Sequence, residues 1–293
     1  IKTPDLLDAL KSIAKEGFSP SSLGQYIRNP IDFYNYKVLG LKQPNDIEET
    51  IEANTFGSVV HYTLEAFYEP FVGETLEVLK LEQLKHKVPE TVEHFFKKLF
   101  KKGDITQGKN LISFEIAKRY INNFLDAEIQ FLNKGNTVQV LAVEESVVLD
   151  FDHPDLDFPI KLKGNVDRID VCNGVRRIID YKTSKVSQTD LNLVDWATIT
   201  QDYKKHSKSF QLLMYAYILN QTDPFNGPTE AGIFSFKNFK SGVIKFTKKD
   251  KPGNGASKQQ EISEEILESY KIQLVALLSE LFNPDIEFIE KEV

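Results

Sequence analysis

Apolar residues recur every three or four positions through about the first 135 residues, which is the spacing of one buried helix face. Pro4 is expected to open a short helix, and Ser21 or Ser22 to cap a second one. Thr55 can cap a third helix, which Pro70 would end. The first part of the chain is therefore predicted to be helical.

Two longer helical stretches follow in the same part of the chain. Residues 75–101 carry apolar positions at helical spacing, with an expected interruption at Pro89. Residues 110–133 form the clearest amphipathic pattern of the sequence.

The period changes near residue 138, where β-branched residues begin to dominate. Helix and strand patterns then alternate to the end of the chain. The expected elements are strands at 138–151, 161–172 and 175–183, a polar stretch at 183–207, a helix at 211–219, strands at 231–236 and 242–247, a mobile loop at 248–260, and a helix at 261–282.

This order indicates an α/β or α+β fold in which a small mixed β-sheet is flanked by helices. Residues 1–136 are expected to form a helical section packed on a core formed by 137–293, the two making one continuous domain.

Asn173-Gly174 between two strand patterns is a strong signal for a two-residue type I′ turn. With that turn, Asp170 faces Arg177 and Ile169 faces Ile178, so one opposite-charge pair and one apolar pair support the register. Continuing the same register places Asp167 opposite Asp180 and Asn165 opposite Lys182. Two facing carboxylates repel each other, so either one is protonated or a cation lies between them.

A carboxylate pair beside a lysine suits phosphodiester hydrolysis. Carboxylate oxygens bind Mg²⁺ or Mn²⁺, and such a metal lowers the pKa of a bound water. Lys182 could orient or deprotonate the attacking water, or hold the phosphate. From the spacing alone, a surface hairpin with two solvated aspartates is an equally good interpretation, because aspartate is common near turns.

Composition changes this picture little. The 293 residues include 41% hydrophobic and 27% charged residues, as in ordinary globular proteins. The net charge of −7 argues mildly against nucleic acid as a partner, but basic segments at 94–104 and 203–210 show that the charge is uneven. The single cysteine, Cys172, excludes an internal disulfide framework and fits a cytoplasmic protein.

The start of the chain has no signal-peptide pattern, and no apolar run approaches the ~18 residues of a membrane span. The missing initial Met leads us to expect a piece of a longer protein.

The segments G-N-V-D-R-I-D (164–170) and I-I-D-Y-K-T-S-K (178–185) resemble the PD-(D/E)XK nuclease superfamily, in particular its RecB-like branch. The resemblance implies a restriction-endonuclease-like core. It makes Asp167 and Asp180 the metal-binding aspartates and Lys182 the catalytic lysine, with the backbone carbonyl of Tyr181 as a further metal ligand.

Three more segments resemble the same branch. G-S-V-V-H-Y-T-L-E (57–65) matches a helical motif that implies His61 at the metal site, and Q-L-L-M-Y-A-Y (211–217) matches a helix that packs on the lysine and the DNA. Gln211 and Tyr215 share one face of that helix. Residues 18–41 resemble the opening segment of the branch, so the ordered set spans residue 18 to about 220.

Many members of the branch hold an iron–sulfur cluster through one cysteine in the opening segment and three near the C-terminus. Asn29 occupies the first of these positions, and no cysteine occurs late in the sequence. Because such a cluster requires about four thiolates, no iron–sulfur cluster is expected.

Several other residues have two interpretations. Glu144 and Glu145 lie in the strand before the hairpin, and since alternation lets only one face the site, Glu145 is favoured. Glu65, one turn after His61, could orient that histidine or lie at the surface. Arg168 points to the opposite face of the hairpin, and a phosphate contact is the less favoured interpretation.

The remaining candidates are expected to be structural. Asp170 pairs with Arg177; His86, His94 and His206 are expected to be solvated, His153 to lie in a loop, and Trp196 to pack in the core rather than to stack on bases.

The favoured hypothesis is a Mg²⁺- or Mn²⁺-dependent cytoplasmic nuclease acting on DNA, in repair or recombination, with a helicase domain or subunit as partner by resemblance and no membrane association. One alternative is an inactive nuclease fold that binds DNA or protein. Another is a structural Ca²⁺ site, which would leave Lys182 unexplained because an ammonium group lowers cation affinity.

Overall fold

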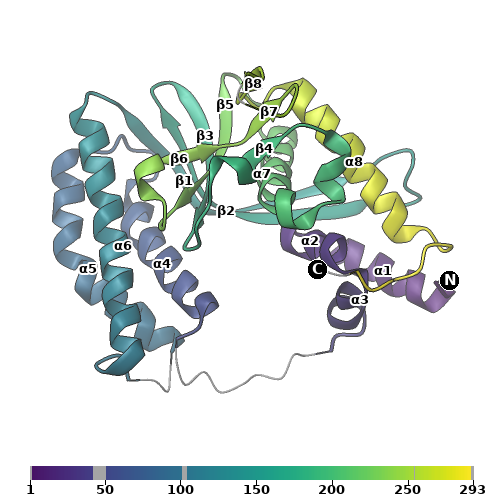
Figure 1. Ribbon diagram of the computed structural model, residues 1–293, viewed down its shortest axis with the longest axis horizontal. Coiled ribbons are helices and arrows are strands. Elements are labelled where there is room, and N and C mark those ends of the chain that lie inside the picture. The colour runs from purple at the N-terminus through teal and green to yellow at the C-terminus, as the bar shows by residue number, and fades with distance from the viewer. Residues whose placement is uncertain (1, 42–50, 101–103, 254, 292–293) are drawn as a thin grey trace.

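The computed structural model describes residues 2–41, 51–100, 104–253 and 255–291. Within these residues a mixed five-stranded sheet crosses the centre of the molecule (Figure 1). The strands β1 (Val138–Phe151), β2 (Ile160–Cys172), β3 (Val175–Lys182), β5 (Thr229–Ser235) and β6 (Val243–Lys245) lie in the order β1-β2-β3-β5-β6. Among the described strand pairs of this five-stranded sheet, only the β3–β5 pair is parallel. Parallel neighbours need a crossover connection, and α7 (Tyr203–Thr222) lies in it.

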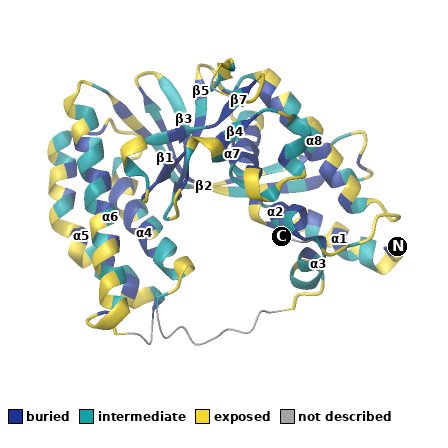
Figure 2. Ribbon diagram, in the orientation of Figure 1, coloured by how far each residue is buried: buried dark blue, intermediate teal, exposed yellow. Residues whose placement is uncertain are grey.

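Helices cover both faces of this sheet, as the predicted fold class requires. One apolar core contains residues of α1 (Pro4–Glu16), α2 (Pro20–Arg28), α3 (Pro30–Phe33), α7 and α8 (Glu264–Phe282). The other contains residues of α4 (Ala53–Tyr68), α5 (Val78–Leu99) and α6 (Gly108–Asn133). Figure 2 shows the buried residues gathered on the sheet and on the helix sides that face it.

The alternation of side chains along β3 links the two cores. Ile178 is buried in the core with α7 and α8, whereas Ile179 and Tyr181 are buried in the core with α4, α5 and α6. Since alternate residues of a strand face opposite sides, Asp180 and Lys182 are directed toward the α7 side.

The N-cap of α2 lies two or three residues before the predicted caps, Ser21 or Ser22. Ser19 is the N-cap: its hydroxyl accepts a hydrogen bond from the Ser22 amide (3.2 Å), and the Ser22 hydroxyl accepts one from the Ser19 amide (2.8 Å). Pro20 then occupies the first helical position, which suits a residue without an amide hydrogen. Neither Ser21 nor Ser22 is therefore the cap.

The predicted start of α4 and the predicted break in α5 are also wrong. α4 begins at Ala53, which places Thr55 inside the helix. α5 continues through Pro89, whose side chain is exposed. Buried residues on both sides of the proline, such as Val88 and Val92, hold this helix against the core, and tertiary packing outweighs the missing hydrogen bond.

The second half of the chain is more ordered than its sequence pattern indicates. The helix predicted at 211–219 begins earlier, at Tyr203, because the Asp202 side chain caps it. The strand predicted at 242–247 is divided into β6 and β7 (Thr247–Lys249). β7 pairs with β4 (Asn192–Leu193) and β8 (Lys258–Gln259) in a second small sheet, so the prediction of a mobile loop for 248–260 is wrong in part.

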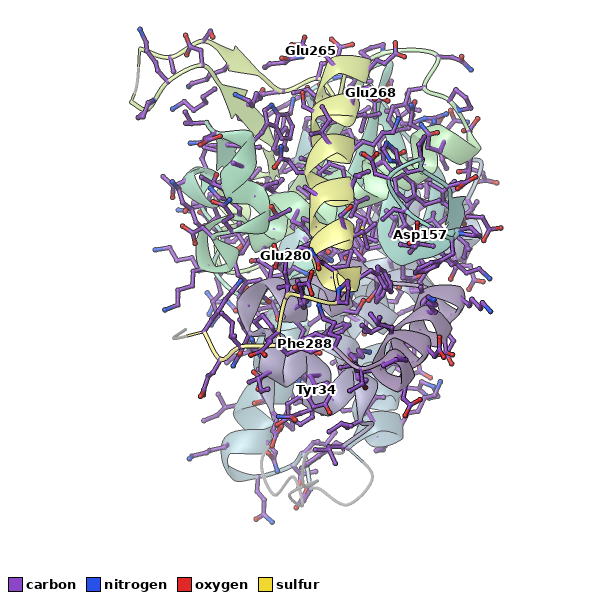
Figure 3. The ribbon with its side chains drawn as sticks, turned by 90° about the vertical axis from the view of Figure 1, so that its right-hand side faces the viewer. Tyr34, Asp157, Glu265, Glu268, Glu280 and Phe288 are labelled. Atoms are coloured by element: carbon purple, nitrogen blue, oxygen red, sulfur yellow. The ribbon has the colours of Figure 1, made fainter. Side chains whose placement is uncertain are left out.

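The segment after α8 returns over the N-terminal helices, where Phe288 lies close to Tyr34 (Figure 3). The two rings stack with their centroids 5.4 Å apart, and Phe288 also meets the edge of Tyr26. Nearby, Oδ1 of Asn29 accepts a hydrogen bond from the Lys291 amide (3.2 Å). The C-terminal segment is thus tied to the opening segment of the chain.

Short helical turns complete the description, at Tyr34–Val38, Glu69–Phe71, Gln188–Leu191, Trp196–Thr200 and Phe239–Ser241. None of the described helices has the length and apolarity that crossing a membrane would require.

Candidate active site

The last residues of β3 carry an ion pair between a buried aspartate and a half-buried lysine. The Asp180 side chain is only 4% exposed, and its two carboxylate oxygens lie 3.2 and 3.0 Å from Nζ of Lys182. Both residues face α7, as the strand alternation requires. Asp180 and Lys182, two residues apart in the sequence, therefore form an ion pair at the end of the strand.

The predicted hairpin register is confirmed over its first five pairs, from Cys172–Val175 to Arg168–Ile179. The described pairing stops there, so Asp167 and Asp180, like Asn165 and Lys182, are not ladder partners. The strands separate at this point because β2 stays with β1 while β3 continues beside β5.

The carboxylate of Asp167 fills part of the opening between β2 and β3. Its Oδ2 accepts a hydrogen bond from the Tyr181 amide (2.5 Å), which takes the place of a ladder bond. Its other oxygen, Oδ1, is directed to His61, whose Nδ1 lies 3.4 Å away. Asp167 thus connects the sheet to helix α4.

Glu144, and not Glu145, is the glutamate that reaches the site. The pairs Val143–Arg168 and Glu145–Val166 place Glu144 opposite Asp167, after a bulge between Val140 and Ala142. Its Oε1 lies 3.6 Å from Nδ1 of His61. The preference for Glu145 is wrong, because that side chain is exposed.

The backbone at Glu144 has φ of 47°, a conformation that is uncommon for residues other than glycine and that breaks the strand alternation. The other carboxylate oxygen of Glu144, Oε2, accepts a hydrogen bond from Nδ2 of Asn165. Oδ1 of Asn165 in turn accepts a hydrogen bond from the Ser146 hydroxyl. Asn165 thus holds Glu144 from the neighbouring strand β2.

His61 joins α4 to the sheet through both ring nitrogens. Nε2 lies 3.0 Å from the carbonyl oxygen of Tyr181, and Nδ1 faces the carboxylates of Asp167 and Glu144. The structure thus brings His61, Asp167 and the Tyr181 carbonyl together, as the resemblance implied, and adds Glu144.

One ligand atom from each of His61, Glu144 and Asp167 lies within 4.8 Å of the others. Carboxylate oxygens with an imidazole nitrogen suit Mn²⁺, and the carboxylates suit Mg²⁺. Asp180 is outside this group and is held by Lys182. The donor set fits a divalent cation, with Asp180 beside it.

The charges of this site shift the pKa values of its groups. Burial lowers the pKa of His61, but hydrogen bonds to Asp167 and Glu144 and nearby negative charge outweigh it and raise the pKa to about 10. Burial raises the pKa of Asp180; Lys182 opposes this and Asp167 reinforces it, so that the pKa is about 6. The site thus has more carboxylates than positively charged side chains. A bound metal ion would balance the remaining negative charge.

Helix α7 supports Asp180 from the other side. Nε2 of Gln211 donates to Oδ1 of Asp180 (2.9 Å) and lies 2.9 Å from the hydroxyl of Tyr215. Gly164 leaves space for that tyrosine, because a Cβ there would lie 2.5 Å from the ring atom Cε1. This contact gives the glycine of the 164–170 motif a physical role that the sequence alone did not show.

Arg168 belongs to a buried ion network on the opposite face of β2. Its side chain is 1% exposed and lies within 2.8 Å of both Glu128 and Asp170. Asp170 also accepts two hydrogen bonds from Arg177, at 2.7 and 2.8 Å, as predicted from the hairpin register. With its guanidinium enclosed, Arg168 is not placed to contact a phosphate, and that interpretation is wrong.

The other candidates fall outside the site. His86 and His94 are exposed and His153 lies in a loop, as expected, whereas His206 is buried and its prediction is wrong. Trp196 packs against the core. Glu65 is half-buried near Glu144, and the contacts described for His61 do not include it.

Two known proteins are similar to this chain. A stretch of 177 residues, 57% of the chain, is 25% identical to an uncharacterized protein of Rickettsia felis; it covers 19% of that protein, so the match spans about a fifth of its length. A crystal structure of a provisionally assigned exonuclease from Eubacterium rectale superposes with a TM-score of 0.49 and 12% identity, over 97% of this chain and 87% of that one.

The family model of the PD-(D/E)XK nuclease superfamily matches residues 17–292, nearly the whole chain. The match includes every element that positions the site, from α2 to α8. The chain therefore belongs to the PD-(D/E)XK nuclease superfamily.

Proposed function

We propose that this chain is a divalent-metal-dependent nuclease that hydrolyses phosphodiester bonds of DNA. The observation that carries the proposal is the meeting of two groups at the end of β3. One is the ligand set of His61, Glu144 and Asp167, and the other is the Asp180–Lys182 ion pair. The ligand set could hold a metal with its bound water, and Lys182 could bind a phosphate beside it.

The metal would be held by Asp167, Glu144, the carbonyl of Tyr181 and His61, with Asp180 as a further carboxylate on its Lys182 side. Mg²⁺ or Mn²⁺ would supply a lowered pKa for water and would offset charge on the reacting phosphate. The fixed hydrogen bond between Asp167 and the Tyr181 amide supports this assignment, because it aims the second carboxylate oxygen at His61.

Lys182 would act as a cation in this scheme. Burial lowers its pKa, but the negative charge of Asp180 outweighs burial and the pKa is raised overall. A protonated amine can donate to a phosphate oxygen and stabilise charge that develops during the reaction. Gln211 and Tyr215 would position this group, since Gln211 bonds the Asp180 oxygen that also meets Lys182.

The finer parts of the proposal rest on the resemblance to the RecB-like branch. These are action on DNA rather than RNA, a role in repair or recombination, exonuclease action and a cytoplasmic location. We propose further that residues 1–136 and 137–293 act as one nuclease domain without an iron–sulfur cluster. A helicase domain or subunit as partner has no support beyond that resemblance.

The test is a cleavage assay with purified chain, single- and double-stranded DNA, and Mg²⁺ or Mn²⁺, beside the Asp180→Ala variant. The expected result is cleavage that requires metal and falls ~10²-fold or more in the variant, as is typical when a preorganised charge is removed. Equal cleavage by both proteins would show that the activity arises elsewhere. Binding without cleavage under every metal would favour the inactive nuclease fold.

A further inference from the structure

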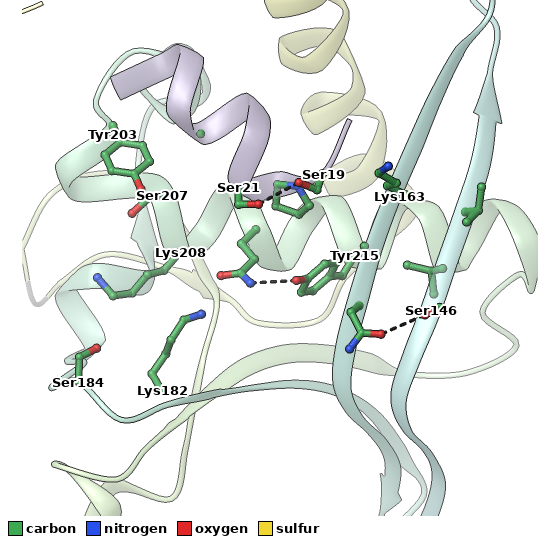
Figure 4. A pocket seen from close by; sticks show the side chains of 17 residues that line it. Ser19, Ser21, Ser146, Lys163, Lys182, Ser184, Tyr203, Ser207, Lys208 and Tyr215 are labelled. Carbon is green, nitrogen blue, oxygen red and sulfur yellow. Dashed lines mark hydrogen bonds between the residues drawn. The ribbon is translucent and has the colours of Figure 1, made fainter. Parts of the chain in front are cut away.

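A cavity of about 690 Å³ opens on the α7 side of Lys182 (Figure 4). Its walls come from the start of α2, the middle of β1 and β2, the end of β3 and the first half of α7. The volume lies within the ~300–1,000 Å³ typical of ligand sites. Lys182, Gln211 and Tyr215 all line it, so the cavity is continuous with the candidate active site.

The charge of the cavity is opposite to that of the chain as a whole. Its described lining residues include three lysines, Lys163, Lys182 and Lys208, and no aspartate or glutamate, although the chain has a net charge of −7. Serine hydroxyls from α2, β1 and α7 add hydrogen-bonding groups. Ammonium groups and hydroxyls together favour an anionic ligand with several oxygen acceptors, such as a phosphate.

Lys208 reaches into this cavity from α7, as Lys182 does from β3 (Figure 4). Its Nζ lies 3.8 Å from Oδ1 of Asp190, at the limit of an ion pair. The carboxylate of Asp190 is already engaged, since its Oδ2 accepts from the amide and hydroxyl of Ser187, both at 2.7 Å. The charge of Lys208 is thus only weakly balanced by the chain itself.

The position of Lys208 on α7 relates it directly to the candidate active site. Lys204, Lys208, Gln211 and Tyr215 follow one another at spacings of four, three and four residues, so they share one helix face. Lys208 lies ~4.5 Å along the helix from Gln211, and the exposed Lys204 lies ~6 Å further. A row of positive charge therefore leads away from the Asp180–Lys182 pair.

We propose that Lys208 and Lys204 bind backbone phosphates of the substrate strand next to the phosphate cut at Lys182. The cavity takes one nucleic-acid strand, since its volume of about 690 Å³ is that of a small-ligand site. This inference rests on the proposed nuclease function and identifies where the uncut part of the strand lies.

The test measures binding of a fluorescent single-stranded oligonucleotide with Ca²⁺ in place of the catalytic metal, over a series of salt concentrations. The logarithm of the binding constant falls linearly with the logarithm of the salt concentration. Each lost phosphate contact should make this negative slope shallower by about 0.7. The slope should therefore become shallower by that amount for Lys208→Gln and for Lys204→Gln, with several-fold weaker binding in each. Lys208→Arg should keep the slope, because it keeps the charge.

Lys205→Gln is the matched control. Lys205 is exposed on the same helix and does not line the cavity; around the helix axis it lies ~100° from Lys204 and ~60° from Lys208. Unchanged binding and slope are expected for it. Equal behaviour of all three glutamine variants, or no binding by the unaltered chain, would overturn the proposal.

A second arm replaces the phosphate next to the cut bond with an uncharged methylphosphonate. This change should weaken binding by the unaltered chain several-fold and have little further effect on Lys208→Gln, because the charge partner is already absent. Equal losses in both proteins would contradict the assignment of Lys208. If these binding results hold but Mg²⁺ and Mn²⁺ give no cleavage, the nuclease proposal fails and the phosphate site stands.

Discussion

Gly164→Ala perturbs the support of the candidate active site at a single defined contact. The added Cβ would lie 2.5 Å from Cε1 and 2.9 Å from Cδ1 of the Tyr215 ring. Ordinary contacts begin near 3.4 Å, so the ring or the strand must move by roughly 1 Å. Overpacking of this size costs typically ~1–3 kcal/mol of folding free energy.

The same movement should reduce activity. The Tyr215 hydroxyl lies 2.9 Å from Gln211, which bonds Asp180, so a displaced ring disturbs the side chain that holds the Asp180–Lys182 pair. A misplacement of ~1 Å can cost ~10²-fold in rate. Cleavage by Gly164→Ala should therefore fall by ~10- to 100-fold, with a smaller change in metal affinity, because the contacts described for His61, Glu144 and Asp167 do not include Tyr215.

The assay combines denaturant unfolding with steady-state cleavage, in a double-mutant cycle with Tyr215→Val. Removing the ring should abolish most of the stability loss caused by Gly164→Ala, without restoring activity. Gly57→Ala is the control, because a Cβ there meets only the Thr183 hydroxyl at 3.7 Å and alanine favours the helix. A stability loss in Gly164→Ala that persists in the Tyr215→Val background would show that the contact with the Tyr215 ring is not its cause.

Three further predictions concern the metal site, the lysine and the buried ion network. Glu144→Gln should lower metal affinity ~10-fold or more, as measured by calorimetry, whereas Glu145→Gln should not, because only Glu144 reaches the ligand group. Lys182→Ala should slow single-turnover cleavage ~10²-fold or more while the protein keeps its circular dichroism spectrum. Asp170→Asn should reduce the free energy of unfolding by ~3–5 kcal/mol, because it removes the negative charge that pairs with the buried Arg168 and the half-buried Arg177. Asp223→Asn, at an exposed pair, should cost less than ~1 kcal/mol.

The local order of the hairpin could be predicted because it depends on short-range rules. Asn173 with positive φ, followed by Gly174, forms the turn, and the Asp170–Arg177 and Ile169–Ile178 pairs follow from it. The prediction failed one step further, at Asp167 and Asp180, where the strands separate. That separation depends on β1 and β5, which are distant neighbours whose pairing no local pattern specifies.

The choice between Glu144 and Glu145 failed for a related reason. Alternation predicts which residues share a face only while a strand is regular, and β1 contains a bulge just before this point. The bulge and the positive φ of Glu144 turn the carboxylate toward His61. The correct choice between the two glutamates requires the β1–β2 register, because that register places Glu144 opposite Asp167.

The helical errors show the effect of tertiary packing on local preference. Pro89 disfavours a helix interior, but it lies on the exposed side of α5 between residues buried against α4 and α6. His206 carries an ionisable side chain, yet it is buried. For Pro89, the contacts that decide the outcome come from the neighbouring helices α4 and α6, which a local sequence pattern does not include.

The proposed metal site holds one divalent cation between His61, Glu144 and Asp167, beside Asp180. Anomalous diffraction from crystals soaked with Mn²⁺, measured at the manganese absorption edge, would locate such a cation. One strong anomalous peak is expected within coordinating distance of Glu144, Asp167 and the Tyr181 carbonyl, and it should be lost in the Asp167→Asn variant. A peak elsewhere, or one that remains in that variant, would disprove this metal site.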